Sequence, residues 1–211
     1  MYEVAAFRET RIEVMHALIR AHPLATLVTV SGGMAEANHL PLLVDPDPMP
    51  NGTLHGHVAR ANPLWRQAPE GEVLVVFQGP QIYVSPSWYP SKREHGKVVP
   101  TWNYAVVHVR GPLQIRDDRE WLRGLVSRLT DSQEAGQRQP WGVGDAPADY
   151  IDRMLEAIVG IEVPVRSIEG KWKVSQNRAQ ADRDGVAAGL SARGDAEALL
   201  MKRLVDGERP V

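Results

Sequence analysis

The feature that most constrains the fold is a series of short β-type runs separated by turn signals. The segment LATLVTV at 24–30 is rich in β-branched residues, and Ser31-Gly32-Gly33 follows it as a turn. Similar runs recur at short spacing, divided by pairs such as Gly79-Pro80 and Gly111-Pro112. Many short strands with such signals predict a β-barrel, although a mixed α+β sandwich fits the same pattern. The predicted strands are 24–30, 34–44, 53–58, 72–78, 81–84, 98–109, 113–115 and 161–168.

Helical patterns flank this β-rich region. Thr10 to Glu13 has the pattern of a capping box, which opens a predicted helix that ends at His22-Pro23. Apolar residues recur at helical spacing after Asp117 and again after Pro147, and a terminal helix is predicted at about 195–205. The polar segment 171–178 follows the last predicted strand. The predicted fold class is therefore mainly β with α (α+β), with peripheral helices covering the ends of a barrel.

Length and composition limit the classes of protein. The chain has 211 residues, which favours a single domain over residues 1–211. It has no cysteine, which excludes disulfides, thiolate metal sites and a cysteine nucleophile. The first ten residues, MYEVAAFRET, lack the basic and apolar regions of a signal peptide, and no apolar run approaches the roughly 20 residues of a membrane helix. We therefore expect a cytoplasmic protein without a membrane partner.

The net charge of -2 does not favour direct DNA binding, which usually shows as a basic stripe. DNA stays open as a partner, because a local basic patch is compatible with this total. No nucleophile elbow, P-loop, dinucleotide-binding glycine motif or helix-turn-helix stands out.

The densest group of polar side chains lies in LHGHVARANP at 54–63. On a strand, His55 and His57 point to the same face, and Arg60 and Asn62 then follow at the strand end. An arginine beside His and Asn donors suits a phosphate, because guanidinium presents a fork of N–H groups to phosphate oxygens. Two other interpretations stay open. The two histidines could chelate zinc with His39 as a third ligand, or they could form hydrogen bonds within the barrel.

Three further segments combine aromatic and polar residues. Lys97 and VPTWNY at 99–104 would place polar and aromatic groups on both faces of one strand, where a heteroaromatic ring or a partner subunit could bind. The Pro-rich loop SPSWYPSK at 85–92 is expected to fold over a ligand or another subunit. The segment EGKWKVSQNR at 169–178 supplies positive charge and amide donors, although a solvated basic turn would have the same composition.

Together these segments resemble the PaiB family of FMN-binding transcriptional regulators. The resemblance covers residues 1 to about 190, and its motifs are long and occur in a fixed order. They are FRET at 7–10, HPLATLVT at 22–29, NHLPLLVD at 38–45, LHGHVARANPLW at 54–65, VVFQGPQIYVSPSWYPSK at 75–92, GKVVPTWNYAVVHVRG at 96–111 and IEGKWKVSQNR at 168–178.

The resemblance implies a split β-barrel of the pyridoxamine-phosphate-oxidase type. Such proteins form homodimers and bind FMN in clefts shared by two subunits. By resemblance, the segment at 55–62 contacts the phosphate, the segment at 99–104 lines the flavin or the dimer interface, and the segment at 171–178 reaches the cofactor. The predicted cofactor-binding residues are His39, His57, Arg60, Asn62, Lys97, Thr101, Trp102, Asn103, Trp172, Lys173 and Gln176. No metal ligand is assigned, and no catalytic residue is identified.

Two functions follow from the resemblance. The first is regulation of transcription by a homodimer that responds to FMN, the usual description of the family. The second is an FMN-dependent oxidoreductase, or a haem-handling protein, because related split barrels carry out such chemistry. In the second case the flavin performs the reaction and the protein supplies binding and electrostatics.

Overall fold

The computed structural model describes residues 1–2, 4–67, 69 and 71–208. The α-helices are α1 (Ile12–Ala21), α2 (Ser91–Glu94), α3 (Arg119–Glu134), α4 (Ala148–Glu156), α5 (Gln180–Arg193) and α6 (Ala196–Val205). The strands are β1 (Arg8–Glu9), β2 (Leu24–Ser31), β3 (Met34–Pro41), β4 (Leu43–Asp45), β5 (Thr53–Ala59), β6 (Val73–Val84), β7 (Thr101–Gly111), β8 (Gln114–Arg116), β9 (Ile158–Pro164) and β10 (Ser167–Lys173). Short 3-10 helices are η1 (Ala5–Phe7), η2 (Pro63–Trp65), η3 (Pro86–Trp88) and η4 (Val143–Asp145).

The chain forms two compact units, each built from separate segments. The first unit contains Met1–His22, Val76–His108 and Ile168–Val211, and the second contains Pro23–Val75 and Val109–Ser167. The chain passes from one unit to the other within β6, β7 and β10. Each unit is described separately below.

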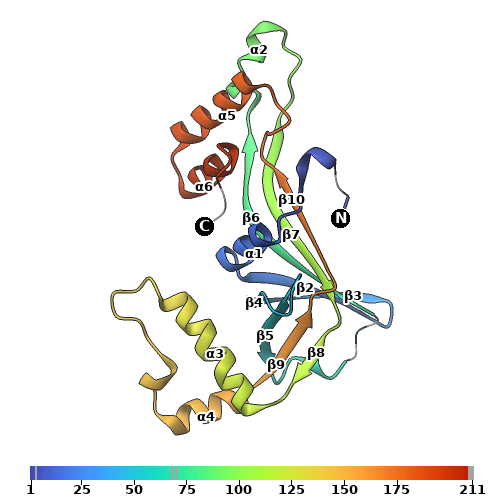
Figure 1. The fold of residues 1–211 in the computed structure, drawn as a ribbon, viewed down its shortest axis with the longest axis vertical. Helices are drawn as coiled ribbons and strands as arrows, with labels where there is room; N and C mark the ends of the chain where they lie inside the picture. The colour runs from blue at the N-terminus through green and yellow to red at the C-terminus, as the bar shows by residue number, and fades with distance from the viewer. Residues whose placement is uncertain (3, 68, 70, 209–211) are drawn as a thin grey trace. The chain divides into compact units, whose positions relative to one another are not determined.

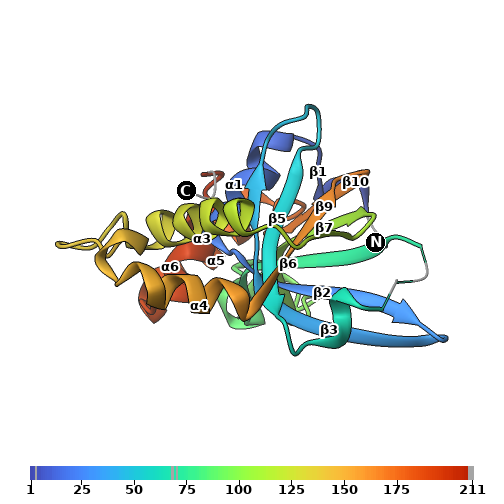
Figure 2. The same cartoon turned by 90° about the horizontal axis from the view of Figure 1, so that it is seen from below.

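The second unit contains an antiparallel hairpin and a four-stranded sheet. Strands β2 and β3 pair along their whole length, from Leu24 opposite Pro41 to Ser31 opposite Met34. The sheet has the order β4-β5-β9-β8, and Ala59 of β5 pairs with Ile158 of β9. Helices α3 and α4 run side by side (Figure 2). They bury Leu122, Ile151 and Leu155 against each other, as expected from the apolar spacing after Asp117 and Pro147.

The first unit combines strands in the order β1-β10-β7-β6 with helices α1, α5 and α6 (Figure 1). Helix α1 buries Leu18 and Ile19, which are almost fully inaccessible to solvent. Gly79 of β6 permits this packing, because a Cβ atom there would lie 2.8 Å from Leu18 Cδ1. Helices α5 and α6 lie next to each other and pack together.

The predicted turn at Gly79-Pro80 is wrong, because β6 continues through it. The buried residues of β6 alternate at odd positions up to Gly79 and at even positions from Pro80 onward. The Gly-Pro pair therefore changes which side chains face the core without ending the strand. The glycine of this pair is explained by the close packing of Leu18 against Gly79, and not by a turn.

The predicted capping box at Thr10 is also wrong. The N-cap of α1 is Arg11, whose side chain makes no capping bond, and the Arg11 backbone N–H donates to Glu9 Oε1 over 2.9 Å. The predicted end of this helix at His22-Pro23 is confirmed, since α1 ends at Ala21 with His22 as its C-cap.

Two elements of the C-terminal part differ from the prediction. The predicted strand at 161–168 is two strands, β9 and β10, so that part of the segment expected to be a polar turn is β-structure. Residues 180–193, for which the sequence predicts no element, form α5. The terminal helix is confirmed as α6, and the side chain of Asp195 caps it by accepting from Ala198 N.

The described helices include none that is both long and apolar enough to cross a membrane.

Candidate functional site

The end of β5 forms one wall of a pocket in the second unit. Residues 38–41 of β3, residues 57–59 of β5, Asn62 and Ile158 enclose a volume of about 320 Å³, and we call this site the β5 pocket. Antiparallel pairing of β5 with β9 brings Ile158 to this wall, because Ile158 lies opposite Ala59. The pocket therefore gathers three predicted cofactor-binding residues, His39, His57 and Asn62.

Two residues that line the β5 pocket each have a buried polar atom without a partner among the described residues. Asn62 Nδ2 donates to Asn38 Oδ1 over 2.7 Å, and Asn62 Oδ1 accepts from Leu64 N at the start of η2. This pair orients the Asn38 amide, and its buried Nδ2 has no hydrogen-bond partner in the described part of the chain. Nδ1 of His57 is likewise buried without a partner there. Unsatisfied buried polar groups are costly, so these two atoms suit a polar ligand that supplies the missing hydrogen bonds.

The electrostatics of the β5 pocket are set by burial. Desolvation lowers the pKa of His57, so its imidazole is neutral at neutral pH. A neutral imidazole has one N–H donor and one acceptor nitrogen, and the Asn38 amide adds a donor. These groups fit the ribityl hydroxyls and phosphate oxygens of a flavin mononucleotide, which offer both acceptors and donors.

The two histidines of β5 have different surroundings. His55 Nδ1 lies 3.2 Å from Glu162 Oε1, without hydrogen-bond geometry, and its ring lies 5.9 Å from the ring of Trp121. Burial lowers the pKa of His55, with the Glu162 carboxylate opposing that effect. Across the described residues there is no cluster of three or more His, Cys, Asp or Glu side chains suited to a metal. The zinc interpretation therefore has no support from the geometry. The surroundings of His55 fit the other interpretation, in which the histidine interacts with residues inside the barrel.

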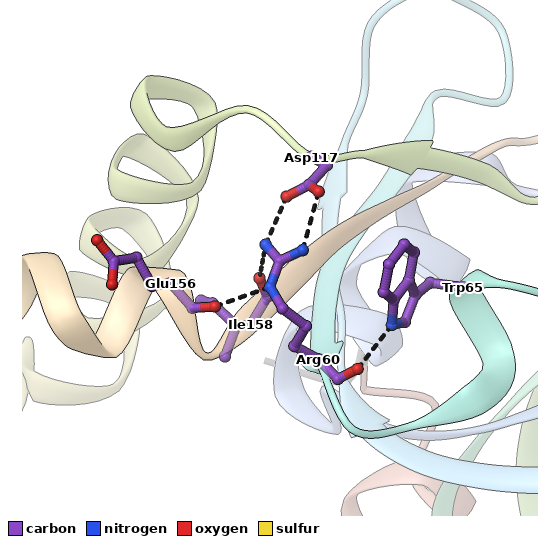
Figure 3. Close-up of polar contacts among 5 residues, drawn as sticks. All are labelled: Arg60, Trp65, Asp117, Glu156 and Ile158. Atoms are coloured by element: carbon purple, nitrogen blue, oxygen red, sulfur yellow. Dashed lines mark hydrogen bonds and ion pairs between the residues drawn. The ribbon is translucent and has the colours of Figure 1, made fainter.

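Arg60 directs its side chain toward Asp117 and the junction of α4 and β9 (Figure 3). Its Nη1 and Nη2 donate to the two carboxylate oxygens of Asp117 over 2.9 and 2.6 Å. Its Nε donates to the carbonyl oxygen of Glu156, and Nη2 also donates to that of Ile158. Arg60 is not among the residues that line the β5 pocket. Its predicted contact with phosphate stays a prediction.

The remaining predicted residues lie in the first unit, where several bond to one another. Asn103 and Ser175 are buried and joined by two hydrogen bonds, from Asn103 Nδ2 to Ser175 Oγ over 2.9 Å and from Ser175 Oγ to Asn103 Oδ1 over 3.3 Å. Lys173 Nζ donates to Thr101 Oγ1, and Gln176 Nε2 donates to the carbonyl oxygen of Trp172. We call this group, Thr101, Asn103, Trp172, Lys173, Ser175 and Gln176, the β7–β10 cluster.

The turn after β10 contains a residue, Ser175, with a left-handed backbone conformation. Ser175 has a φ of 66°, and it is the one non-glycine residue with a positive φ among those the structure describes. A left-handed conformation is unfavourable for serine, and its bonds with Asn103 hold it in place. Gln176 Oε1 closes the turn by accepting from Val174 N over 2.8 Å.

Two residues of the β7–β10 cluster also line a second pocket. Trp172 and Gln176 border a volume of about 180 Å³ together with Arg8, Arg11 and Arg183. The Arg11 side chain is paired with Glu9, and Arg183 Nη2 donates to the carbonyl oxygen of Val205. Arg11 and Arg183 therefore each support a neighbouring segment of the first unit.

Lys97 and Trp102 are exposed to solvent. The Trp102 side chain is 55% exposed, and its ring meets that of Tyr83 edge-on with centroids 6.1 Å apart. The backbone N–H of Lys97 donates to His95 Nδ1 over 3.0 Å.

The loop at 85–92 packs within its own unit. Gly189 lets α5 approach Trp88 closely, because a Cβ atom there would lie 2.4 Å from Trp88 Cδ2. Tyr89 is 2% exposed, and the Arg178 guanidinium lies 5.1 Å from the centre of its ring. Tyr89 is therefore a core residue, and the expected contact of this loop with a ligand or another subunit stays a prediction.

Two residues at or near the β5 pocket, Asn38 and Asp117, are not among those predicted from the sequence. Asn38 lies in the NHLPLLVD motif, but only His39 of that segment was selected. Asn38 pairs with Asn62 across 24 residues, and no local pattern predicts that contact. Asp117 is 57 residues from Arg60 in sequence, and no local pattern predicts that contact.

Comparison with known proteins gives the family. Residues 1–167 match the family model described as "Putative FMN-binding domain". The protease synthase and sporulation protein PAI 2 of Bacillus subtilis is 32% identical over 207 residues, which cover 98% of this chain and 97% of that protein. An uncharacterized protein of Emericella nidulans is 34% identical over 230 residues, covering 92% of each chain. The chain belongs to the PaiB family of flavin-binding proteins.

Solved structures support the fold assignment of this PaiB-family chain. The FAD- and haem-binding protein of Mycobacterium smegmatis has a TM-score of 0.59 at 17% identity, and the match covers 86% of this chain and 80% of that protein's chain. The flavocytochrome Anf3 of Azotobacter vinelandii has a TM-score of 0.59 at 12% identity, and the match covers 82% of this chain and 72% of the flavocytochrome chain. The predicted α+β split barrel of the flavin-binding type is confirmed. The β5 pocket lies wholly within the matched residues, whereas Trp172, Lys173 and Gln176 lie beyond them.

Proposed function

We propose that the chain is one FMN-binding domain over residues 1–211 and that the β5 pocket holds the polar part of the flavin. The observation that carries this proposal is the pair of buried, unpartnered nitrogens, Asn38 Nδ2 and His57 Nδ1, on residues that line the β5 pocket of a flavin-family chain. Asn38 donates to a phosphate or hydroxyl oxygen, and neutral His57 donates or accepts. Exposed His39 lies at the same pocket and adds a third polar group.

Bound FMN supplies a redox-active ring, and the residues of the chain bind and orient its tail. Asn62 fixes the Asn38 amide, so that the free N–H faces a constant direction. The predicted contacts from Lys97, Thr101, Trp102, Asn103, Trp172, Lys173 and Gln176 stay predictions.

Fluorescence titration tests this function directly. FMN fluorescence should be quenched on binding to the full-length protein, with FMN favoured over riboflavin because the latter lacks the phosphate. FAD serves as a second competitor, because it carries the same ring on a larger tail. Absence of binding by all three flavins would refute the proposal.

We further propose that the protein works as a cytoplasmic homodimer that regulates transcription in response to FMN. An exposed apolar surface supports a dimer, because Trp102 and Tyr83 are 55% and 43% exposed on the strands of the first unit. The similarity to PAI 2 of Bacillus subtilis supports a role of the kind that its name states. Ultracentrifugation with and without FMN tests the dimer, and a gel shift whose affinity falls steeply with salt tests DNA contact. Turnover of NAD(P)H without DNA binding would support the oxidoreductase instead.

A further inference from the structure

We infer that Arg60 is a positioning residue that holds the wall of the β5 pocket, and that it does not contact the flavin phosphate. This inference rests on the proposed flavin site, and it assigns Arg60 a role different from the one that its motif predicts. Four observations support it.

First, the guanidinium of Arg60 is already bonded. It has five N–H donors, and four of them have acceptors: two on Asp117, one at Glu156 O and one at Ile158 O. Figure 3 shows these acceptors grouped around one side chain. Only one N–H is left over, so a phosphate that formed a two-bond contact with Arg60 would have to displace an acceptor already bound.

Second, the charge of Arg60 is already compensated. Asp117 forms a planar two-bond pair with it, and the hydrogen bond from Arg60 lowers the pKa of the Asp117 carboxyl group. The carboxylate is therefore ionised at neutral pH. A phosphate placed against Arg60 would face this negative charge.

Third, the Arg60 backbone connects the same segments as its side chain. Its N–H donates to Ala157 O over 2.8 Å, and its C=O accepts from Trp65 Nε1 over 2.9 Å. The guanidinium also lies 5.6 Å from the Trp65 ring centre. One residue thus joins the end of β5, the junction of α4 and β9, and η2.

Fourth, the segments that Arg60 joins are the ones that line the pocket. Ala59 precedes Arg60, Ile158 accepts a bond from it, and Asn62 follows two residues later. Ala59, Ile158 and Asn62 all border the β5 pocket. Loss of the guanidinium would loosen this wall and so weaken binding of any ligand inside it.

The decisive experiment compares FMN with riboflavin in matched variants. If Arg60 is a positioning residue, Arg60→Ala and Asp117→Asn should each weaken the binding of both flavins, by about tenfold. Within each variant the loss should be the same for FMN and for riboflavin, so that the ratio of the two affinities stays within twofold of wild type. The double variant should be no weaker than Arg60→Ala alone, because the contact with Asp117 is already lost when the guanidinium is removed. Arg66→Ala is the matched control, since Arg66 also lies over the Trp65 ring, at 4.6 Å, and does not line the pocket.

A direct phosphate contact gives a different pattern. Arg60→Ala would then lower the affinity ratio at least tenfold with riboflavin binding unchanged, and Asp117→Asn would strengthen FMN binding by releasing the guanidinium. Either result overturns the inference. Failure of the wild-type protein to bind any flavin would instead refute the proposed function.

Amide hydrogen exchange provides a test that needs no flavin. Arg60→Lys and Asp117→Asn retain most of the side-chain volume and should still fold. Both should speed exchange at Arg60, whose N–H bonds to Ala157 O, and in the segment 57–62, relative to Arg66→Ala. Unchanged exchange in both variants would overturn the positioning role.

Discussion

The β5 pocket and the β7–β10 cluster are both rich in polar side chains, but their hydrogen bonds are arranged in opposite ways. In the pocket, Asn38 Nδ2 and His57 Nδ1 are buried without partners. In the cluster, Asn103, Ser175, Lys173 and Gln176 bond to neighbours within the same unit. Polar groups that satisfy one another stabilise the fold, whereas unsatisfied groups are available to a ligand. The difference predicts that variants in the cluster change stability and variants in the pocket change affinity.

The largest effect on stability is expected from Asn103→Ala. This change removes both bonds to Ser175, leaves a buried hydroxyl unsatisfied and creates a void, so the free energy of unfolding should fall by about 2–3 kcal/mol. Urea unfolding measures it. Asn177→Ala, at an exposed neighbouring position, should change stability by no more than about 0.5 kcal/mol. Equal stability of the two variants would show that the cluster is not structural.

Asn38→Asp should have the next largest effect, on affinity. Aspartate keeps an oxygen for Asn62 Nδ2 but replaces the free donor with a negative charge. FMN should bind at least tenfold more weakly, because a hydrogen bond to a charged group contributes roughly 1.5–3 kcal/mol and about 1.4 kcal/mol is a factor of ten. Fluorescence titration measures the change, with Asn177→Asp as a control for added charge. Unchanged affinity would show that Asn38 does not contact FMN.

Acidification should affect stability through three histidines that are buried or half-buried. Burial lowers the pKa of His22 in the first unit and of His55 and His57 in the second. Between the ordinary histidine pKa, about 6.5, and the lowered folded values, the unfolded chain binds more protons than the folded one. The free energy of unfolding should therefore fall as pH decreases below about 6.5. Urea unfolding at pH 7.5 and 5.5 tests this, and His57→Gln should reduce the slope. Rising stability on acidification would contradict the neutral state of these side chains.

Lys173→Met should give the smallest effect. It removes one hydrogen bond to Thr101, which is worth about 0.5–1 kcal/mol of stability. If the cluster is only structural, FMN affinity should stay within twofold of wild type. A tenfold loss of affinity with unchanged stability would make Lys173 a cofactor contact and remove the contrast between the two regions.

The sequence predicted the elements whose pattern reflects local chemistry. Strand β2 and helix α3 were predicted because β-branched content and apolar spacing follow from which faces are buried. Helix α5 was missed because it contains Gly185 and Gly189, which weaken a helical pattern. Those glycines are explained by the approach of Trp88, and a contact between distant segments cannot be read from local spacing.

The same limit applies to the candidate site. Residue types in the HGHVARAN segment predicted a binding site at the end of a strand, and His57 and Asn62 both line the β5 pocket there. The carboxylate that pairs with Arg60 lies 57 residues away, and the orientation of Asn38 depends on a bond across 24 residues. Whether a donor is free or occupied is decided by such distant contacts, so the sequence identified candidate groups but not their availability.

The passage of the chain between the units within three strands has a consequence for how this protein can change over evolutionary time. The first unit comes from three stretches of the chain and the second from two, so no single stretch of the gene encodes either of them. A recombination event that exchanges one contiguous stretch therefore cannot replace one whole unit without also replacing part of the other. New cofactor preferences are expected to arise by point substitutions around the existing pocket, and not by shuffling of modules.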